Sequence, residues 1–230
     1  MSKIKANEIS NLAGDAPPAI TGGYTYVTTL YYTSPGTHQF VKANYPWLRG
    51  IRATVTGAGG GGGGAGGNGR GGGSGAAGAT GIKWLNEAAI AALPPSADVV
   101  VGAGGSGGAA GENDGSPGGS SSFDSVTAPG GLQGNRSASG HGGIGTGATG
   151  ADLSIPGGDG ASGAQVAGGF PGLGGASYWG GGPRTPAATS NRPGVDGRAP
   201  GTGGSGGYRH DADVAGGTGA DGIVVLELYA

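Results

Sequence analysis

Alternating hydrophobic and polar residues predict β-strands near both ends of the chain. Residues 24–32 are aromatic, β-branched or leucine throughout, which suits a pleated strand, and the SPGT turn at 34–37 separates them from a second expected strand at His38–Lys42. Apolar and polar residues alternate again from Gly50 to Thr56, and Ile223–Tyr229 is the most hydrophobic run of the chain. Because an unpaired strand of that kind would aggregate, we expect it to pair with Gly50–Thr56.

Short apolar segments in the middle of the chain predict the rest of a β core. Lys83–Leu85, Asp98–Val101 and the stretch 120–128 each predict one short strand. Residues 86–93 have a helix-forming composition that stops at Pro94, which predicts one or two helical turns. The predicted fold is mainly β: a small β-sandwich with long glycine-rich loops and very little α-helix.

Glycine recurs at a spacing of three between these strands. In the tract 57–81, nine successive positions of one register are glycine. A period of three matches the polyproline II type of helix, which makes no internal hydrogen bonds, and glycine at the contacts would let such helices bond to one another through their backbones. We therefore expect packed polyglycine II helices, in which leucine at Gly63 or Gly72 disrupts folding more than leucine at Asn68 or Ala79. The alternative is a set of ordered loops or flexible linkers.

Composition divides the chain into two parts. Residues 1–22 hold little apolar material, and we expect an N-terminal attachment and oligomerisation segment there. Residues 23–230 are expected to form one tip domain, a β core with glycine-rich tracts inserted at 57–81, 102–119 and 129–222.

The overall composition excludes several classes of protein. Glycine and proline supply 62 and 14 of the 230 residues, whereas the 12 basic and 14 acidic residues are spread thinly. With no polybasic block to hold a phosphate backbone or an anionic membrane, we expect neither nucleic-acid binding nor membrane insertion. Cysteine is absent, which removes disulfides, zinc thiolate sites and a cysteine nucleophile.

Candidate chemical sites are weak. The stretch GGTGADGI at 216–223 matches a calcium-binding nonapeptide once, with Asp221 as the ligand, but such sites need tandem repeats. Glu112-Asn113-Asp114 fits an exposed turn better than a calcium site. His210 with Asp211 lacks the sequence context of a hydrolase, and neither GxSxG nor HExxH is present. We expect no metal, no cofactor and no enzymatic activity.

Four segments together resemble a known family. RGIRATVTGAGGGGGG, IKWLNEAAIAALPPSADVVVGAGGSGG, GGSSSFDSVTAPGG and GADGIVVLELYA occur in the order seen in the glycine-rich domain of bacteriophage tail-fibre and tail-tip proteins. The opening KIKANEISNLAGDAPPA resembles the start of short phage fibre proteins. The resemblance implies a virion protein that attaches to the host surface, and a homotrimer joined to other tail or virion proteins through residues 1–22. The alternative is a structural virion component, such as a head fibre, decoration or tail-assembly protein, without receptor contact.

Aromatic and basic residues that interrupt the later glycine tracts are the expected receptor contacts. Flat rings suit sugars or apolar protein surface, and arginine forks suit carboxylates and phosphates, so the expected receptor is a host surface glycan or an outer-membrane protein. The candidates are Phe170, Tyr178, Trp179, Arg184, Arg192, Arg198, Tyr208, Arg209 and His210. The alternative is that Phe170 and Trp179 fill gaps between glycine helices or pack on the β core.

Overall fold

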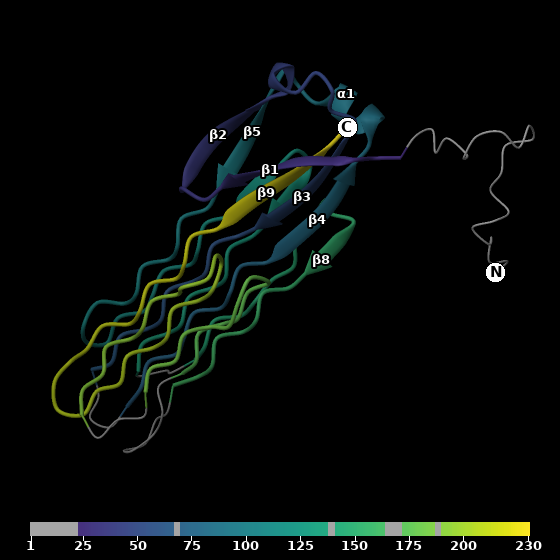
Figure 1. Ribbon diagram of the computed structural model, residues 1–230. Coiled ribbons are helices and arrows are strands. Elements are labelled where there is room, and N and C mark those ends of the chain that lie inside the picture. Colours follow the sequence, from purple (N-terminus) through teal and green to yellow (C-terminus); the bar gives the residue numbers. More distant parts are fainter. Residues whose placement is uncertain (1–22, 67–69, 138–140, 164–171, 187–189) are drawn as a thin grey trace, which may run out of the picture.

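A bundle of glycine-rich tracts extends from one end of a β-sandwich in the computed structural model (Figure 1). The structure describes residues 23–66, 70–137, 141–163, 172–186 and 190–230. The expected attachment segment 1–22 therefore lies outside the described residues.

Two antiparallel sheets form the sandwich, as the sequence predicts. One sheet has the strand order β1-β9-β3-β4-β8 and the other β2-β5-β6-β7. The strands are β1 (Tyr26–Tyr32), β2 (Gly36–Val41), β3 (Gly50–Thr56), β4 (Thr80–Leu85), β5 (Ser96–Val101), β6 (Ser121–Phe123), β7 (Val126–Ala128), β8 (Leu153–Ile155) and β9 (Ile223–Tyr229). Helix α1 (Glu87–Ala92) and a short 3-10 helix, η2 (Lys42–Asn44), lie at the end of the sandwich away from the tracts.

The hydrophobic core lies between the two sheets. The predicted pairing of the last strand is confirmed, since β9 runs antiparallel to β3 with Leu228 opposite Ile51 and Ile223 opposite Thr56. Alternate residues of both strands point inward, which buries Val55 and Leu226 completely. The predicted helical turn is also present, and the Asn86 side chain caps it by accepting from the Ala89 N–H.

Two expectations from the sequence, one for a strand and one for a glycine tract, were wrong. The stretch 120–128 is a hairpin of β6 and β7 and not one strand, because the chain reverses at Asp124, which has a φ of 52°. Aspartate tolerates this left-handed conformation better than most residues, so Asp124 carried a turn signal. The tract 129–222 is also interrupted, since β8 pairs with β4 within it.

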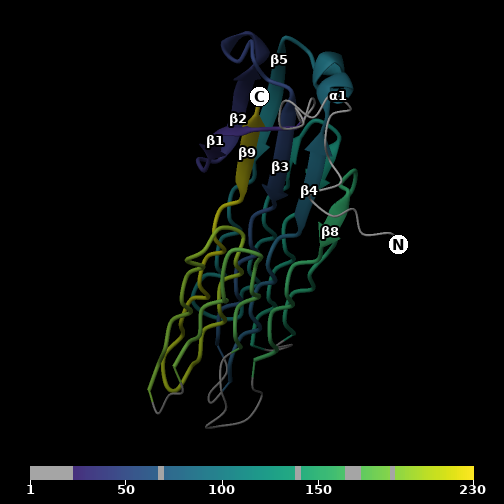
Figure 2. The same cartoon turned by 45° about the vertical axis from the view of Figure 1, so that its right-hand side comes forward.

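Glycine tracts continue the strands at one end of the sandwich. Strand β3 runs directly into the tract 57–65, and the returning tract 71–79 runs directly into β4. The tract 214–222 leads into β9 in the same way. Figure 2 shows the tracts running side by side along the length of the bundle. The strands therefore fix where each tract begins and how it is aligned with its neighbours.

Hydrogen bonds in the tract 57–65 repeat every three residues. The N–H groups of Gly57, Gly60 and Gly63 donate to the returning tract, at Ala79, Ala76 and Gly73. The next register, from Ala58, donates to the tract 113–119, and the third, from Gly59, donates to the tract 214–220. Each register thus faces a different neighbour, as three residues per turn requires.

The carbonyl groups of the same tract accept from three further neighbours. Ala58 accepts from Gly131, Gly59 from Gly105 and Gly60 from Gly204, at N–O distances of 2.9 Å. Three consecutive residues therefore bond to six surrounding tracts. This is the packing of polyglycine II helices, with every donor and acceptor satisfied by a neighbour and none by its own helix.

Glycine is required in this lattice because of space and not because of its backbone angles. A Cβ atom built at Gly63 would lie 2.0 Å from the carbonyl oxygen of Asn135, and one at Gly75 would lie 2.0 Å from that of Gly60. Among the described glycines of the tracts 57–81, 102–119 and 129–222, only Gly111, Gly150 and Gly201 have φ values in the left-handed region. A side chain at the other contact positions would push neighbouring backbones apart and break their hydrogen bonds.

Three tracts form the interior of the bundle: 57–65, 71–79 and 201–208. They are hydrogen-bonded to one another, and every residue in these three ranges is buried. An inner tract has neighbours on all sides, so all of its registers need small residues; Ala79 is fully buried and bonded to Pro129. Leucine at Ala79 is therefore also expected to disrupt folding, so Ala79 does not provide the expected contrast with Gly63 and Gly72, and Asn68 lies outside the described residues.

Outer tracts show the three-residue rule in its simple form. In the tract 102–108, Gly102, Gly105 and Gly108 are buried, whereas Ala103 and Ser106 are exposed. A Cβ at Gly104 would also lie 2.0 Å from the carbonyl oxygen of Gly219, so two registers of this tract have to be glycine and only the third, exposed register accepts other residues.

We expect leucine at Gly63 to destabilise the protein by about 3 kcal/mol or more. Its side chain would overlap the Asn135 carbonyl and push the tract that contains Asn135 away from the inner tract 57–65. Leucine at the exposed Ser106 is the matched control and should change the free energy of unfolding by less than about 0.5 kcal/mol. Urea denaturation measures both variants. Equal effects would contradict the role of the lattice contacts.

Candidate functional site

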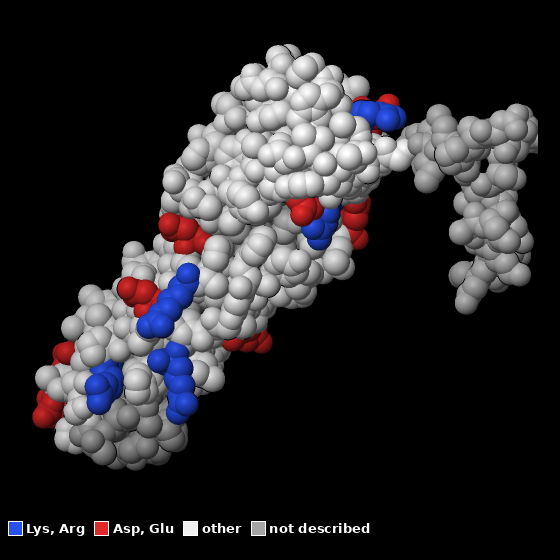
Figure 3. All heavy atoms as spheres, viewed as in Figure 1, with Lys and Arg blue, Asp and Glu red and all other residues white. Residues whose placement is uncertain are grey.

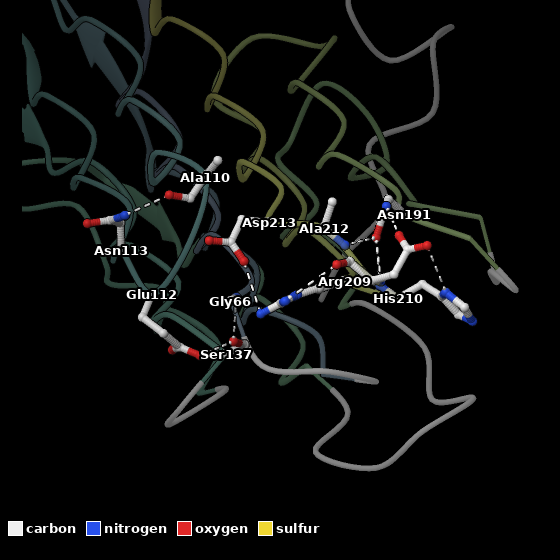
Figure 4. A network of polar contacts seen from close by, with 11 residues as sticks. Gly66, Ala110, Glu112, Asn113, Ser137, Asn191, Arg209, His210, Ala212 and Asp213 are labelled. Atoms are coloured by element: carbon white, nitrogen blue, oxygen red, sulfur yellow. Dashed lines mark hydrogen bonds and ion pairs between the residues drawn. The ribbon is translucent and has the colours of Figure 1, made fainter.

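Polar turns join the tracts at the end of the bundle away from the sandwich, and we call this end the tip (Figure 4). The turn 209–213, which joins the inner tract 201–208 to the tract 214–222, is held by Asn191. The Asn191 side-chain oxygen accepts from the N–H groups of His210, Asp211 and Ala212 at 2.8, 3.0 and 3.1 Å. The turn is therefore fixed by a side chain from a neighbouring tract.

Asn191 also orients an acidic side chain. Its amide nitrogen donates to Asp211, and this hydrogen bond, assisted by the nearby His210, lowers the pKa of the Asp211 carboxyl. Sequence reasoning missed Asn191. The only available signal was its position just before Arg192-Pro193, where an asparagine between glycine tracts favours a capped turn.

Arg209 and Asp213 close the same turn. Arg209 Nη1 lies 3.0 Å from Asp213 Oδ1, and the Arg209 N–H donates to the carbonyl of Arg70. Asp213 also lies beside the neighbouring turn at Gly111, where a Cβ would come within 3.3 Å of its carboxylate. Arg209 is thus tied into the scaffold of the tip, and its side chain is only 24% exposed.

A second polar cluster joins three further tract ends. The Ser137 hydroxyl donates to Glu112 Oε1 at 2.7 Å and accepts from the Gly66 N–H at 3.1 Å, and Asn113 donates to the carbonyl of Ala110 at 3.1 Å. The Glu112 carboxylate and the Asn113 amide are therefore engaged in hydrogen bonds that hold this turn against its neighbours.

Several aspartates act as lattice acceptors in place of a carbonyl group. Asp221 Oδ1, the expected calcium ligand, accepts from the Gly104 N–H at 2.8 Å, and Asp114 accepts from the Arg136 N–H at 2.7 Å. Asp159 and Asp196 accept from Gly145 and Thr218 in the same manner. No group of three or more histidines and carboxylates that could hold a metal occurs in the described part of the chain.

Tyr178 and Trp179 lie at the junction of the sandwich and the bundle, and not at the tip. The Trp179 indole N–H donates to Thr56 Oγ1 at 2.9 Å, at the end of β3, and the ring packs edge-to-face against Tyr178. Tyr178 is 47% exposed and contacts Arg52 of β3. Trp179 therefore anchors a returning turn to the sheet, which is the alternative that the sequence left open.

Tyr208 is a packing residue, which corrects its assignment as a receptor contact. Only 1% of it is exposed, and its backbone pairs with that of Arg192 in both directions at 2.8 Å. It ends the inner tract 201–208, where a large ring replaces glycine at the last position. Phe170 lies outside the described residues. Ser205 is also buried, with its hydroxyl bonded to Thr185 and Val195.

Apart from Tyr178, the exposed candidates divide between the tip and a groove on the side of the bundle. Arg192 and His210 are exposed at the tip. Arg184 and Arg198 line a groove of about 270 Å³ together with Gly181, Gly182, Pro183 and Val195. No sequence signal placed these two arginines together, because they lie on two different tracts that line the groove. On the face shown in Figure 3, basic side chains lie over the glycine tracts with acidic side chains around them, and a further group of both charges lies over the sandwich.

A family model described as a glycine-rich domain matches residues 33–229. No curated protein matches the chain. In the described segments, none of the helices has the length and apolar character needed to cross a membrane.

We expect Trp179→Phe to lower the free energy of unfolding by about 1 kcal/mol, because it removes the hydrogen bond to Thr56 while keeping an aromatic ring. The control, Tyr178→Phe, removes a hydroxyl whose contact with Arg52 lies at the surface, where Arg52 is already paired with Glu227, and should cost less than about 0.5 kcal/mol. Thermal or urea unfolding distinguishes the two. If Tyr178→Phe costs as much as Trp179→Phe, the anchoring role of Trp179 is wrong.

Proposed function

The chain belongs to the glycine-rich domain family, and we propose that within it the protein is a bacteriophage tail-fibre or tail-tip protein that binds the host cell surface non-covalently. The observation that carries this proposal is the division of the molecule into a sandwich at one end and, at the other, turns held on a lattice of backbone hydrogen bonds. Such turns can change in sequence without disturbing the tracts that support them.

Exposed polar groups at the tip supply suitable contacts. His210 and Arg192 project from turns that Asn191 and the Tyr208 backbone hold in place, so a ligand would bind groups that are already ordered. Binding to preorganised side chains loses less conformational entropy than binding to free loops. The ordered turns at the tip therefore support the proposal that this virion protein attaches to the host surface through its tip.

One observation favours the alternative of a structural virion component without receptor contact. Trp179, Tyr208 and Arg209, which the sequence offered as contacts, are engaged in packing or ion pairs. A protein whose aromatic residues serve only its own fold would be a spacer or decoration, and adsorption measurements distinguish the two functions.

We expect the double variant Arg192→Ala, His210→Ala to keep its fold and to lose about tenfold in adsorption to susceptible bacteria, since a few charged and aromatic residues dominate most interfaces. The control removes the same residue types from the sandwich, Arg49→Ala with His38→Ala, and should adsorb like the unmodified protein. Fluorescently labelled protein and a panel of Gram-negative strains provide the measurement. Failure of the unmodified protein to adsorb to any host of a virus that carries it would contradict the attachment role.

The trimer that the family resemblance implies also remains a prediction. We expect light scattering to give three times the chain mass at micromolar concentration, with residues 1–22 required for assembly. A monomeric full-length protein would contradict it, and a monomer that adsorbs would leave the attachment role intact.

A further inference from the structure

The groove beside Arg184 and Arg198 is a gap in the lattice. Its two walls are the tracts 182–186 and 192–198. The chain runs toward the tip in the first tract and returns toward the sandwich in the second. Within the described residues no backbone hydrogen bond joins these two tracts to each other. The tract 192–198 is bonded to the inner tract 201–208 through its backbone, and the tract 182–186 through the Thr185 hydroxyl, which donates to the Gly206 carbonyl. The groove therefore lies where a contact between neighbouring tracts is missing.

One buried serine holds both walls. Ser205 Oγ lies 2.6 Å from Thr185 Oγ1 and accepts from the Val195 N–H at 2.8 Å, while the Ser205 N–H donates to the Val195 carbonyl at 3.0 Å. Thr185 and Ser205 are both buried. Because Arg184 and Val195 are fixed through these contacts, the groove keeps its width in the absence of a ligand.

The side chains of the two arginines of the groove have no hydrogen-bond or ion-pair partner among the described residues. Arg49, Arg52 and Arg209 each form an ion pair with a carboxylate, but Arg184 and Arg198 form neither an ion pair nor a side-chain hydrogen bond there. The nearest acid in sequence to Arg198 is Asp196, and its carboxylate accepts from the Thr218 N–H on another tract at 2.7 Å. In the described part of the chain, no carboxylate therefore pairs with either of these two positive charges.

The remaining wall is open to a small polar ligand. A Cβ at Gly181 would meet no atom within 4 Å, so this part of the wall is bare backbone facing open space. Guanidinium groups bind carboxylates and phosphates through paired hydrogen bonds. A volume of about 270 Å³ lies just below the range of pockets that hold drug-sized ligands, and so suits one sugar ring with its charged group.

We propose that Arg184 and Arg198 form a binding site for a single anionic sugar unit, bearing a phosphate or a carboxylate, of a bacterial surface polysaccharide. Identification of the ligand as a cell-surface sugar rests on the proposed attachment function. The binding of an anionic sugar to the groove does not.

The test uses saturation-transfer NMR and titration of the full-length protein with glucose 6-phosphate, glucuronate and glucose. We expect one or both anionic sugars to bind and glucose to bind at least tenfold more weakly. Binding of the phosphate alone would point to phosphorylated core sugars, and binding of the carboxylate alone to uronic-acid polymers. Equal binding of glucose, or no binding of either anionic sugar at 10 mM, a concentration on the order of a weak small-ligand dissociation constant, would overturn the proposal.

Variants assign the binding to the groove. Arg184→Ala and Arg198→Ala should each raise the dissociation constant about tenfold, because each removes a charged hydrogen-bond donor, and the double variant should abolish binding. Arg49→Ala, which removes the same charge from the sandwich, should have no effect. Unchanged binding in a folded double variant would overturn the site.

Adsorption separates this site from the general function. If the unmodified protein adsorbs to cells and the double variant binds no sugar yet adsorbs equally well, the groove is not the contact and the attachment function stands. If the protein binds anionic sugars through the groove but adsorbs to no cells, the site stands and the attachment function fails.

Discussion

Backbone hydrogen bonds between glycine tracts, made at a separation that no Cβ atom allows, are the interaction on which the rest of the molecule depends. Ala58, Gly59 and Gly60 together bond to six neighbouring tracts. Each such bond contributes only about 1 kcal/mol net, and ordering a residue costs a similar amount, so the lattice gains little from any single contact. Its stability comes from satisfying every inner donor and acceptor at once, and we therefore expect one added side chain at Gly63 or Gly75 to have a large effect.

The β-sandwich supplies the alignment that the tracts lack. Glycine tracts have few side chains that could distinguish one register from another, and a slip by one residue would exchange the neighbours that each register faces. Strand β3 bonds to both β4 and β9, and the tracts that extend from these three strands are also neighbours. The ordinary hydrophobic core therefore specifies the arrangement of a bundle that has almost no hydrophobic core of its own, and the bundle in turn holds Asn191, Arg184 and Arg198 in fixed positions.

Sequence patterns predicted the fold better than they predicted the candidate site. Side-chain alternation predicted β3, continuous hydrophobicity predicted β9, and the need to cover an unpaired apolar strand predicted their pairing. The spacing of glycine indicated helices of three residues per turn. Continuous glycine, as in 59–64, had a meaning that the three-residue count missed: it marks an inner tract, where all registers face a neighbour. The site was harder to predict, because an aromatic residue between glycines can plug the lattice, as Tyr208 does, or remain exposed, as Tyr178 does. Only the packing of distant tracts decides between the two, and it also brings Arg184 beside Arg198.

Hydrogen exchange of the inner-tract amides tests the lattice most directly. These amides belong to residues with almost no side chain to bury, so their only protection is the bond to a neighbouring tract. We predict that the amides of Gly60, Gly75 and Gly204 exchange as slowly as those of β3 and β9, because opening them requires the bundle to unfold. Exchange at the rate of an unstructured glycine linker, while β3 and β9 stay protected, would contradict the account.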